Sequence, residues 1–160
     1  MVKIFLAFGS NVGNRKNNID KAIELLKKKV HDVTVSPYYL TRPVGFADQE
    51  NFINAALVGQ TTLDPQELLI LIRDTEKKIG RIKRFKNGPR EIDIDILFYG
   101  DLVYTDNDLV IPHPAIASRD FVLRPLVNLD KQFIHPVLNQ TVEELYSKIK
   151  TQQRSIISGV

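Results

Sequence analysis

A single run of alternating residues constrains the fold of this chain more than any other feature. From Ile92 to Phe98 every second residue is large and apolar, and Asp93 and Asp95 occupy two of the positions between them. A period of two is typical of a β-strand, so the isoleucines and Phe98 are expected on one face and both carboxylates on the other. We therefore predict a strand with an apolar face against a core and two adjacent carboxylates opposite.

The two carboxylates need a partner. Adjacent like charges repel each other and are costly on a half-buried sheet, unless water or a cation covers them. Mg²⁺ suits such a pair, because it takes a few carboxylate oxygens and fills its other positions with water and substrate phosphates. Without further context, however, an Asp-x-Asp pair is more often a solvated strand face than a metal site.

The loop before this strand supplies further context. Its cations are Arg81, Lys83, Arg84, Lys86 and Arg90. Gly88-Pro89 predicts a rigid turn that delivers Arg90 to the start of the strand. The formal net charge of +3 is modest and its excess lies in this loop, which favours a locally bound anion over a long nucleic-acid track. A metal ion beside a basic loop indicates phosphoryl chemistry.

Length and composition exclude several classes of protein. The 160 residues predict one domain, over residues 1–160. The chain has no cysteine, which excludes disulfides, thiolate nucleophiles and cysteine-based zinc sites, so oxygen or histidine must bind any metal. No apolar stretch is long enough to span a bilayer and no secretory leader precedes Val2–Leu6, so we expect a cytoplasmic protein.

Periodicity and capping signals predict the other elements. Extended segments are expected over Lys3–Phe8, Val33–Thr41 and Phe52–Thr61, and a helix from about Asn17 to Lys28. A second helix has the clearest boundaries, with Asp64 as N-cap, Pro65 at the first helical position and Gly80 as the stop.

Three further signals follow the aspartate strand. Gly100-Asp101 predicts a hairpin turn into Leu102–Tyr104, Thr141 begins a capping box for a last helix, and the tail from Thr151 is expected to fray. The order of elements predicts an α+β fold: an antiparallel sheet with helices packed on it and a ferredoxin-like core. The long loop Arg42–Asn51 is expected to be functional.

Several short motifs occur in a specific order and spacing. They are Gly9-Ser10-Asn11, Thr41-x-Pro43-x-Gly45, Asp48-Gln49-x-x-Phe52-x-Asn54-Ala55-Ala56, Gly80-Arg81, Gly88-Pro89-Arg90-x-x-Asp93-x-Asp95-x-Leu97, and Pro112-His113 through Arg119-x-Phe121. With these motifs the chain resembles the 6-hydroxymethyl-7,8-dihydropterin pyrophosphokinases from Ile4 to about Leu126. The resemblance implies transfer of the β,γ-pyrophosphoryl unit of ATP to the hydroxymethyl group of a reduced pterin, giving AMP and the pterin diphosphate in folate biosynthesis. It implies ATP and the pterin as partners and two Mg²⁺ ions. We also expect a monomer with no nucleic-acid or membrane partner.

The resemblance also implies roles for individual residues. Asp93 and Asp95 would bind the Mg²⁺ ions, and Arg81, Arg90 and Asp95 would be catalytic, with Asp95 the best candidate for a general base. The implied ATP-binding residues are Glu76, Arg81, Lys83, Arg84, Arg90, Ile96, Leu109, Val110, His113 and Arg119. The implied pterin-binding residues are Thr41, Arg42, Pro43, Val44, Phe52, Asn54, Asp93 and Phe121. Among them Phe52 and Phe121 would stack on the two faces of the pterin, and Asn54 would read its polar edge.

The chain departs from the family pattern at Arg42, Phe52, Asn87 and Pro114, and we assign no nucleotide or lid contact to Arg42, Asn87 or Pro114. The loops Arg42–Asn51 and Arg81–Gly88 are expected to be mobile without ligand and to close when both substrates bind.

Two other classes of function remain open at this point. A small RNA-binding module would suit a ferredoxin-like sheet and a basic isoelectric point, although the aromatic signature of such modules is missing. A Mg²⁺-dependent phosphohydrolase would share the aspartate pair. Product analysis separates them: AMP formed only with a reduced pterin indicates the kinase, phosphate or pyrophosphate without an acceptor indicates the hydrolase, and neither product indicates the binding module.

Overall fold

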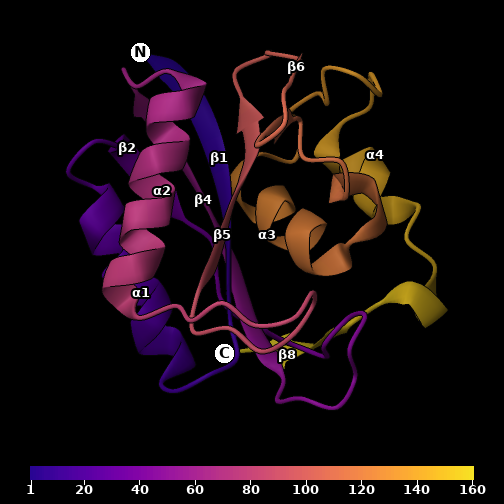
Figure 1. Cartoon of the computed structure of the whole chain (residues 1–160). Coiled ribbons are helices and arrows are strands. Elements are labelled where there is room, and N and C mark those ends of the chain that lie inside the picture. Colours follow the sequence, from indigo (N-terminus) through magenta and orange to yellow (C-terminus); the bar gives the residue numbers. More distant parts are fainter.

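A computed structural model describes all residues 1–160, and its centre is an antiparallel sheet (Figure 1). The elements in chain order are β1 (Val2–Ser10), α1 (Arg15–Leu26), β2 (His31–Val35), β3 (Tyr39–Thr41), β4 (Phe52–Thr61), α2 (Pro65–Ile79), β5 (Asp93–Tyr99), β6 (Tyr104–Thr105), β7 (Val110–Ile111), a 3-10 turn (Ile116–Ser118), α3 (Asp120–Asp130), α4 (Val142–Ser147), a second 3-10 turn (Thr151–Gln153) and β8 (Ile156–Gly159). The strand order is β5-β1-β4-β3-β8, and β2 also pairs with β4. The α+β fold with a ferredoxin-like core is confirmed, because β1-α1-β2/β3-β4-α2-β5 forms an antiparallel sheet with β1 between β4 and β5.

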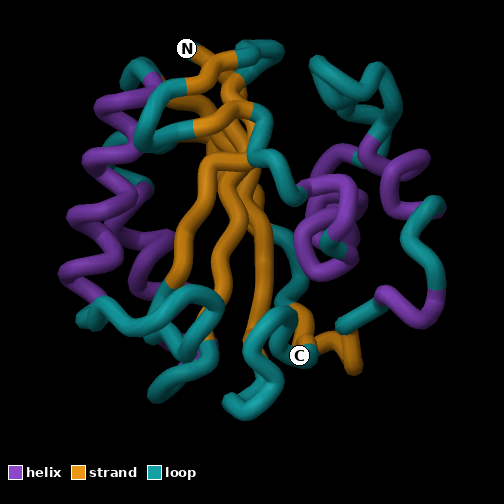
Figure 2. The backbone as a smooth tube through the Cα atoms, turned by 45° about the vertical axis from the view of Figure 1, so that its right-hand side comes forward, coloured by secondary structure: helices purple, strands orange, loops and turns teal.

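Helices cover both faces of this sheet, as the view in Figure 2 shows. The alternation of β1 explains why there are two cores. Ile4, Leu6 and Phe8 face α1 and α2, while Phe5 faces α3 and α4. Strand β1 therefore contributes to two hydrophobic cores, one on each face of the sheet.

The helix boundaries follow from local capping chemistry. α2 begins at the predicted N-cap Asp64, which forms a capping box with Glu67. It ends at the predicted Gly80, whose φ of 102° lies in the left-handed region that glycine tolerates. α1 begins two residues before the predicted Asn17, because the Asn14 side chain accepts a hydrogen bond from the Asn17 backbone N–H and acts as N-cap.

One prediction about the aspartate strand is wrong. Phe98 does not share a face with the isoleucines, because the register with β1 shifts between Phe5 and Leu6. Leu97 is the extra residue of this bulge, and a bulge reverses the alternation beyond it. Phe98 therefore packs edge-on against Phe5, at 5.7 Å between ring centroids, on the face of α3 and α4.

Three other predicted elements are also wrong in detail. The segment Val33–Thr41 is two strands rather than one, since Ser36 to Tyr38 are not paired as a strand. Gly100-Asp101 does not form a hairpin onto β5, because β6 pairs with β7 instead. The tail from Thr151 is not frayed: its strand β8 pairs with β3, a partner more than a hundred residues away. No helix is long and apolar enough to cross a membrane.

Candidate active site

A cavity opens on the sheet face that carries α3, where segments distant in the sequence meet. It is lined by Ala7, Phe8, Gly9, Thr41, Val44, Phe52, Asn54, Asn87, Arg90, Asp93, Asp95, Arg119, Phe121 and Val122. We refer to it as the aromatic cavity, because Phe52 and Phe121 belong to its wall. Both predicted aspartates also face it.

Gly9 keeps the floor of this cavity open. In the sheet it lies between Asn54 of β4 and Asp93 of β5. A Cβ atom at Gly9 would lie 2.8 Å from the Asn54 side-chain oxygen, which is closer than real side chains come. The missing side chain therefore makes room for the Asn54 amide.

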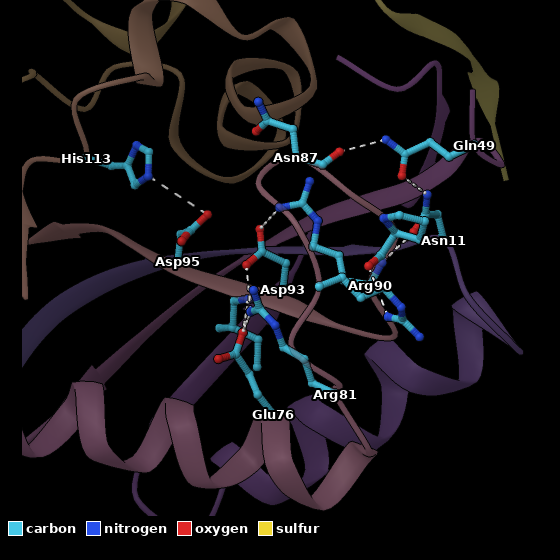
Figure 3. A network of polar contacts seen from close by, with 12 residues as sticks. Asn11, Gln49, Glu76, Arg81, Asn87, Arg90, Asp93, Asp95 and His113 are labelled. Atoms are coloured by element: carbon cyan, nitrogen blue, oxygen red, sulfur yellow. Dashed lines mark hydrogen bonds and ion pairs between the residues drawn. The ribbon is translucent and has the colours of Figure 1, made fainter. Parts of the chain in front are cut away.

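The two aspartates are paired very differently, as Figure 3 shows. Asp93 accepts hydrogen bonds from Arg81 over 3.0 Å and from Arg90 over 3.3 Å. Asp95 accepts no hydrogen bond within the chain, and His113 Nε2 lies 4.0 Å from its Oδ2. Burial and the neighbouring Asp93 carboxylate raise the pKa of Asp95 to about 7. The Asp95 carboxylate is therefore left without the partner that its charge requires.

The donor set fits a hard divalent cation with few protein ligands. No group of three or more acidic, histidine or cysteine side chains comes together as a complete metal site. Asp93 and Asp95 offer carboxylate oxygens beside an open cavity. Mg²⁺ accepts one or two carboxylates and takes its other ligands from water and substrate phosphates, so this arrangement suits it.

A second cavity, which we call the cationic cavity, adjoins the first along the loop between α2 and β5. It is lined by Arg73, Glu76, Lys77 and residues 81–90. Four residues predicted to bind ATP phosphates line it: Arg81, Lys83, Arg84 and Arg90. Arg90 and Asn87 line both cavities, so they form the boundary between the two.

Glu76 connects the cationic cavity to the aspartate strand. Its Oε2 accepts a hydrogen bond from the Arg81 guanidinium and another, over 3.1 Å, from the Ile94 backbone N–H. Arg81 therefore bridges Glu76 and Asp93 (Figure 3). Burial raises the pKa of Glu76, although Arg81 opposes the shift.

Arg84 is held at the rim of this cavity by another carboxylate. Its two terminal nitrogens donate to Glu91 over 2.9 and 2.7 Å. The hydrogen bonds from Arg84 lower the pKa of Glu91 to about 2. A phosphate would have to compete with Glu91 for this guanidinium.

The remaining residues predicted for ATP are less concentrated. Arg119 lines the aromatic cavity and His113 lies beside Asp95. Ile96 and Leu109 are buried in the core against α1 and α2, while Val110 is exposed on β7. These last three side chains line neither cavity.

Most residues predicted for the pterin do come together. Thr41, Val44, Phe52, Asn54, Asp93 and Phe121 all line the aromatic cavity. The Asn54 amide donates to Thr41 Oγ1 over 2.7 Å, which holds its orientation. The Arg90 guanidinium lies over the Phe52 ring at 5.1 Å. Arg42 and Pro43 do not line the cavity, and the Arg42 guanidinium donates to the Arg154 backbone oxygen instead.

The two long loops contact each other beside the aromatic cavity. Gln49 Nε2 donates to the Asn87 backbone oxygen over 2.8 Å, and Asn11 Nδ2 donates to Gln49 Oε1 over 2.8 Å (Figure 3). The rings of Phe46 and Phe85 meet edge-on, with their centroids 4.9 Å apart. The loops are therefore joined by both polar and aromatic contacts.

Sequence reasoning missed five residues of the aromatic cavity: Ala7, Phe8, Gly9, Asn87 and Val122. Only Asn87 had a local signal, the turn residues Gly88-Pro89 that follow it. In the structure Asn87 has a positive φ of 60°, a conformation that asparagine tolerates better than most residues. Ala7, Phe8 and Gly9 depend on sheet register and Val122 depends on the packing of α3, neither of which the local sequence shows.

Known proteins include clear relatives of this chain. Residues 5–131 match the family model described as 7,8-dihydro-6-hydroxymethylpterin-pyrophosphokinase. A 2-amino-4-hydroxy-6-hydroxymethyldihydropteridine pyrophosphokinase from Aquifex aeolicus is 44% identical over 90% of both chains. The folic acid synthesis protein FOL1 of Dictyostelium discoideum is 41% identical over 89% of this chain, which spans 22% of that longer protein.

The fold has counterparts among solved structures. In a crystal structure of wild-type Plasmodium falciparum HPPK-DHPS, a matching region has a TM-score of 0.75 at 18% identity and covers 92% of this chain and 44% of that one. At this identity the likeness concerns the fold alone. The family match and the Aquifex relative confirm what the motifs indicated: the chain belongs to the 7,8-dihydro-6-hydroxymethylpterin-pyrophosphokinase family, whose reaction is a pyrophosphoryl transfer in folate biosynthesis.

Proposed function

We propose that the chain transfers the β,γ-pyrophosphoryl group of ATP to the hydroxymethyl oxygen of 6-hydroxymethyl-7,8-dihydropterin. The oxygen forms a bond to the β-phosphorus, the bond from that phosphorus to the α,β-bridging oxygen breaks, and AMP leaves. The observation that carries the proposal is the position of the aspartate pair. Asp93 and Asp95 line the aromatic cavity, and Asp93 is ion-paired with Arg81 and Arg90 of the cationic cavity.

The two cavities suit the two substrates. The aromatic cavity has a phenylalanine ring for each face of a flat pterin and the Asn54 amide for its polar edge. The cationic cavity offers guanidinium forks that match phosphate oxygens. Because Arg90 lines both, the phosphates of ATP would reach the pterin hydroxymethyl group at their common boundary.

Asp93 and Asp95 would hold two Mg²⁺ ions. When bound, Mg²⁺ neutralises phosphate charge and orients the triphosphate for in-line transfer. Asp95 is also the best candidate to accept the proton of the pterin hydroxyl, since it is free of hydrogen bonds to arginine. Arg81 and Arg90 would stabilise charge on the phosphates as the bridging bond breaks.

The other ATP contacts follow from the family resemblance and from exposure. Lys83, Arg84, His113 and Arg119 would extend the cationic wall. Ile96 and Leu109 have buried side chains, so any contact with the adenosine part would use their backbone groups. Glu76 would act chiefly by holding Arg81. Arg42 and Pro43 would likewise contribute backbone groups to the pterin edge.

Product analysis tests the proposal. The protein is incubated with ATP and Mg²⁺, with and without the reduced pterin, and nucleotides and phosphates are separated. The expected result is AMP and pterin diphosphate that appear only when the pterin is present. Release of phosphate or pyrophosphate without pterin would instead indicate a phosphohydrolase, and no product at all would indicate a binding protein.

A further inference from the structure

A buried carboxylate beside the aromatic cavity has no role in the chemistry above. Asp120 is the first residue of α3 and is 1% exposed. It lies between Arg119 and Phe121, which both line the cavity. A buried carboxylate is costly unless hydrogen bonds satisfy its oxygens. The identity of its donors therefore indicates what Asp120 does.

All of the donors to Asp120 come from the C-terminal segment. Ser155 Oγ donates to Oδ1 over 2.7 Å, and the backbone N–H groups of Ser155 and Ile156 donate to Oδ2 over 2.8 and 3.0 Å. Hydrogen bonds to an ionised acceptor are stronger than those between neutral groups. Ser155 is itself buried, with 6% exposed. The start of α3 is thus bound firmly to residues 154–160, which we call the C-terminal strap.

The other side of the strap is bound to the opposite wall of the cavity. Strand β8 pairs with β3, and Thr41 lies opposite Ile156. The Ser155 backbone oxygen accepts a hydrogen bond from the Arg42 N–H over 2.8 Å. Thr41 in turn holds the Asn54 amide. In Figure 1 the yellow C-terminal strap, which includes β8, passes below α3.

We propose that Asp120 and Ser155 are positioning residues for the pterin. Through them the C-terminal strap holds the Phe121 wall of the cavity at a fixed separation from the Thr41 and Asn54 wall. A flat ring stacked between two walls is sensitive to that separation, because a gap of a fraction of an ångström forfeits much of the contact energy. This inference rests on the proposed function, since it takes the aromatic cavity as the pterin site.

Ser155→Ala tests the proposal with little disturbance, because it removes the hydroxyl and keeps both backbone donors to Asp120. The dissociation constants of the pterin and of a non-hydrolysable ATP analogue are measured separately. We expect the pterin constant to rise about tenfold, the equivalent of one charge-assisted hydrogen bond. The ATP-analogue constant should change by less than about twofold. Ser155→Thr, which keeps the hydroxyl, should restore pterin binding.

Ser36→Ala is the matched control. Ser36 is a serine of similar burial, 5% exposed, whose Oγ accepts from the Ala56 N–H and donates to the Pro37 oxygen away from the cavity. It should lower the melting temperature like Ser155→Ala but leave the pterin constant unchanged. Equal effects of the two alanine variants on pterin binding, or no effect of either, would overturn the positioning role.

Amide hydrogen exchange of the wild-type chain provides a second test that does not depend on a variant folding. If the hydrogen-bonded strap increases the affinity for the pterin, then pterin binding must stabilise the hydrogen-bonded strap by the same factor. The Ser155 and Ile156 amides should therefore exchange more slowly with pterin bound, and unchanged rates would contradict the proposal. A wild-type chain that forms no AMP would refute the proposed function as well, whereas an active wild type with an unresponsive strap would refute only this inference.

Discussion

At the aspartate pair, two arginines hold Asp93 while Asp95 faces the cavity without a hydrogen bond. This difference makes Asp95→Asn the sharper of the two possible substitutions. It removes a charge and a metal ligand but leaves no arginine without its hydrogen-bond partner. Transfer should therefore fall by more than about a hundredfold. The metal-free melting temperature should not decrease, because repulsion from Asp93 is relieved.

Asp101→Asn is the control for this substitution, since Asp101 is an exposed acid of the turn after β5. It should leave both turnover and melting temperature unchanged. Wild-type turnover by Asp95→Asn at ordinary Mg²⁺ concentrations would show that the aspartate pair is not the metal site.

The two phenylalanines of the aromatic cavity support a second prediction. Phe52→Ala and Phe121→Ala should each weaken pterin binding by about 1–3 kcal/mol, the usual contribution of an aromatic stacking partner. ATP binding should be nearly unchanged, because neither ring lines the cationic cavity. Separate calorimetric titrations of the two ligands measure this. Equal losses for both ligands would mean that the rings serve the core instead.

Among the elements, the turn before α4 depends on a neutral histidine. His135 is 6% exposed, and its Nδ1 accepts hydrogen bonds from the Val137 and Leu138 backbone N–H groups over 3.2 and 3.1 Å. Burial lowers the pKa of His135 below its ordinary value of 6.5. The unfolded chain therefore binds the proton more readily, so stability is lost as the pH falls through about 6.5.

His135→Asn isolates this effect, because an asparagine oxygen can accept the same two backbone hydrogen bonds without titrating. Between pH 7 and pH 5 the free energy of unfolding should decrease more for the wild type than for His135→Asn. The slopes of unfolding free energy against pH cannot differ by more than about 1.4 kcal/mol per pH unit, the limit for one proton. Parallel pH profiles from urea unfolding would contradict the prediction.

The two long loops are also elements with a testable behaviour. The two loops are already joined by the contacts of Gln49 with Asn87 and of Phe46 with Phe85. The cations of the second loop line the cationic cavity and can still bind phosphate oxygens. We expect the amides of Arg42–Asn51 and Arg81–Gly88 to become more protected when Mg²⁺, an ATP analogue and the pterin are all bound. Hydrogen exchange with one and with both ligands measures this closure. Unchanged protection in the ternary complex would rule out a lid.

Arg81→Ala and Arg84→Ala test what closure does for the reaction. If these arginines contact the phosphates chiefly in the closed state, the substitutions should slow transfer more than they weaken ATP binding. Arg84→Ala should have the smaller effect, because Glu91 already occupies its guanidinium. Single-turnover rates and ATP-analogue titrations separate the two quantities, and equal losses in both would contradict the prediction.

In the molecule as a whole, the interior strand β1 contributes to both hydrophobic cores. Ile4, Leu6 and Phe8 belong to one core and Phe5 to the other. Neither layer can lose its packing without disturbing β1, so the chain should unfold as a single domain in one cooperative step. Urea unfolding followed by far-ultraviolet circular dichroism and by tyrosine fluorescence should give coincident curves. Two separated transitions would mean that the helical layers unfold independently.

The features predicted correctly are those whose physical causes lie within a few residues of one another. The capping box at Asp64, the glycine stop at Gly80 and the alternation around Asp93 and Asp95 predicted α2 and the acidic face of β5 correctly. The order of elements predicted the fold class, and the family motifs predicted the family. The resemblance also named most of the residues that line the aromatic cavity, but only five of the thirteen that line the cationic cavity.

The features that depend on a distant partner could not be predicted and became visible only in the folded chain. The bulge at Leu97 and the face of Phe98 are set by the register with β1, and the ordered tail is set by the edge of β3 and the buried carboxylate of Asp120. Hydrogen bonding between strands and the burial of a charge are properties of two segments together, so neither segment alone carries the signal.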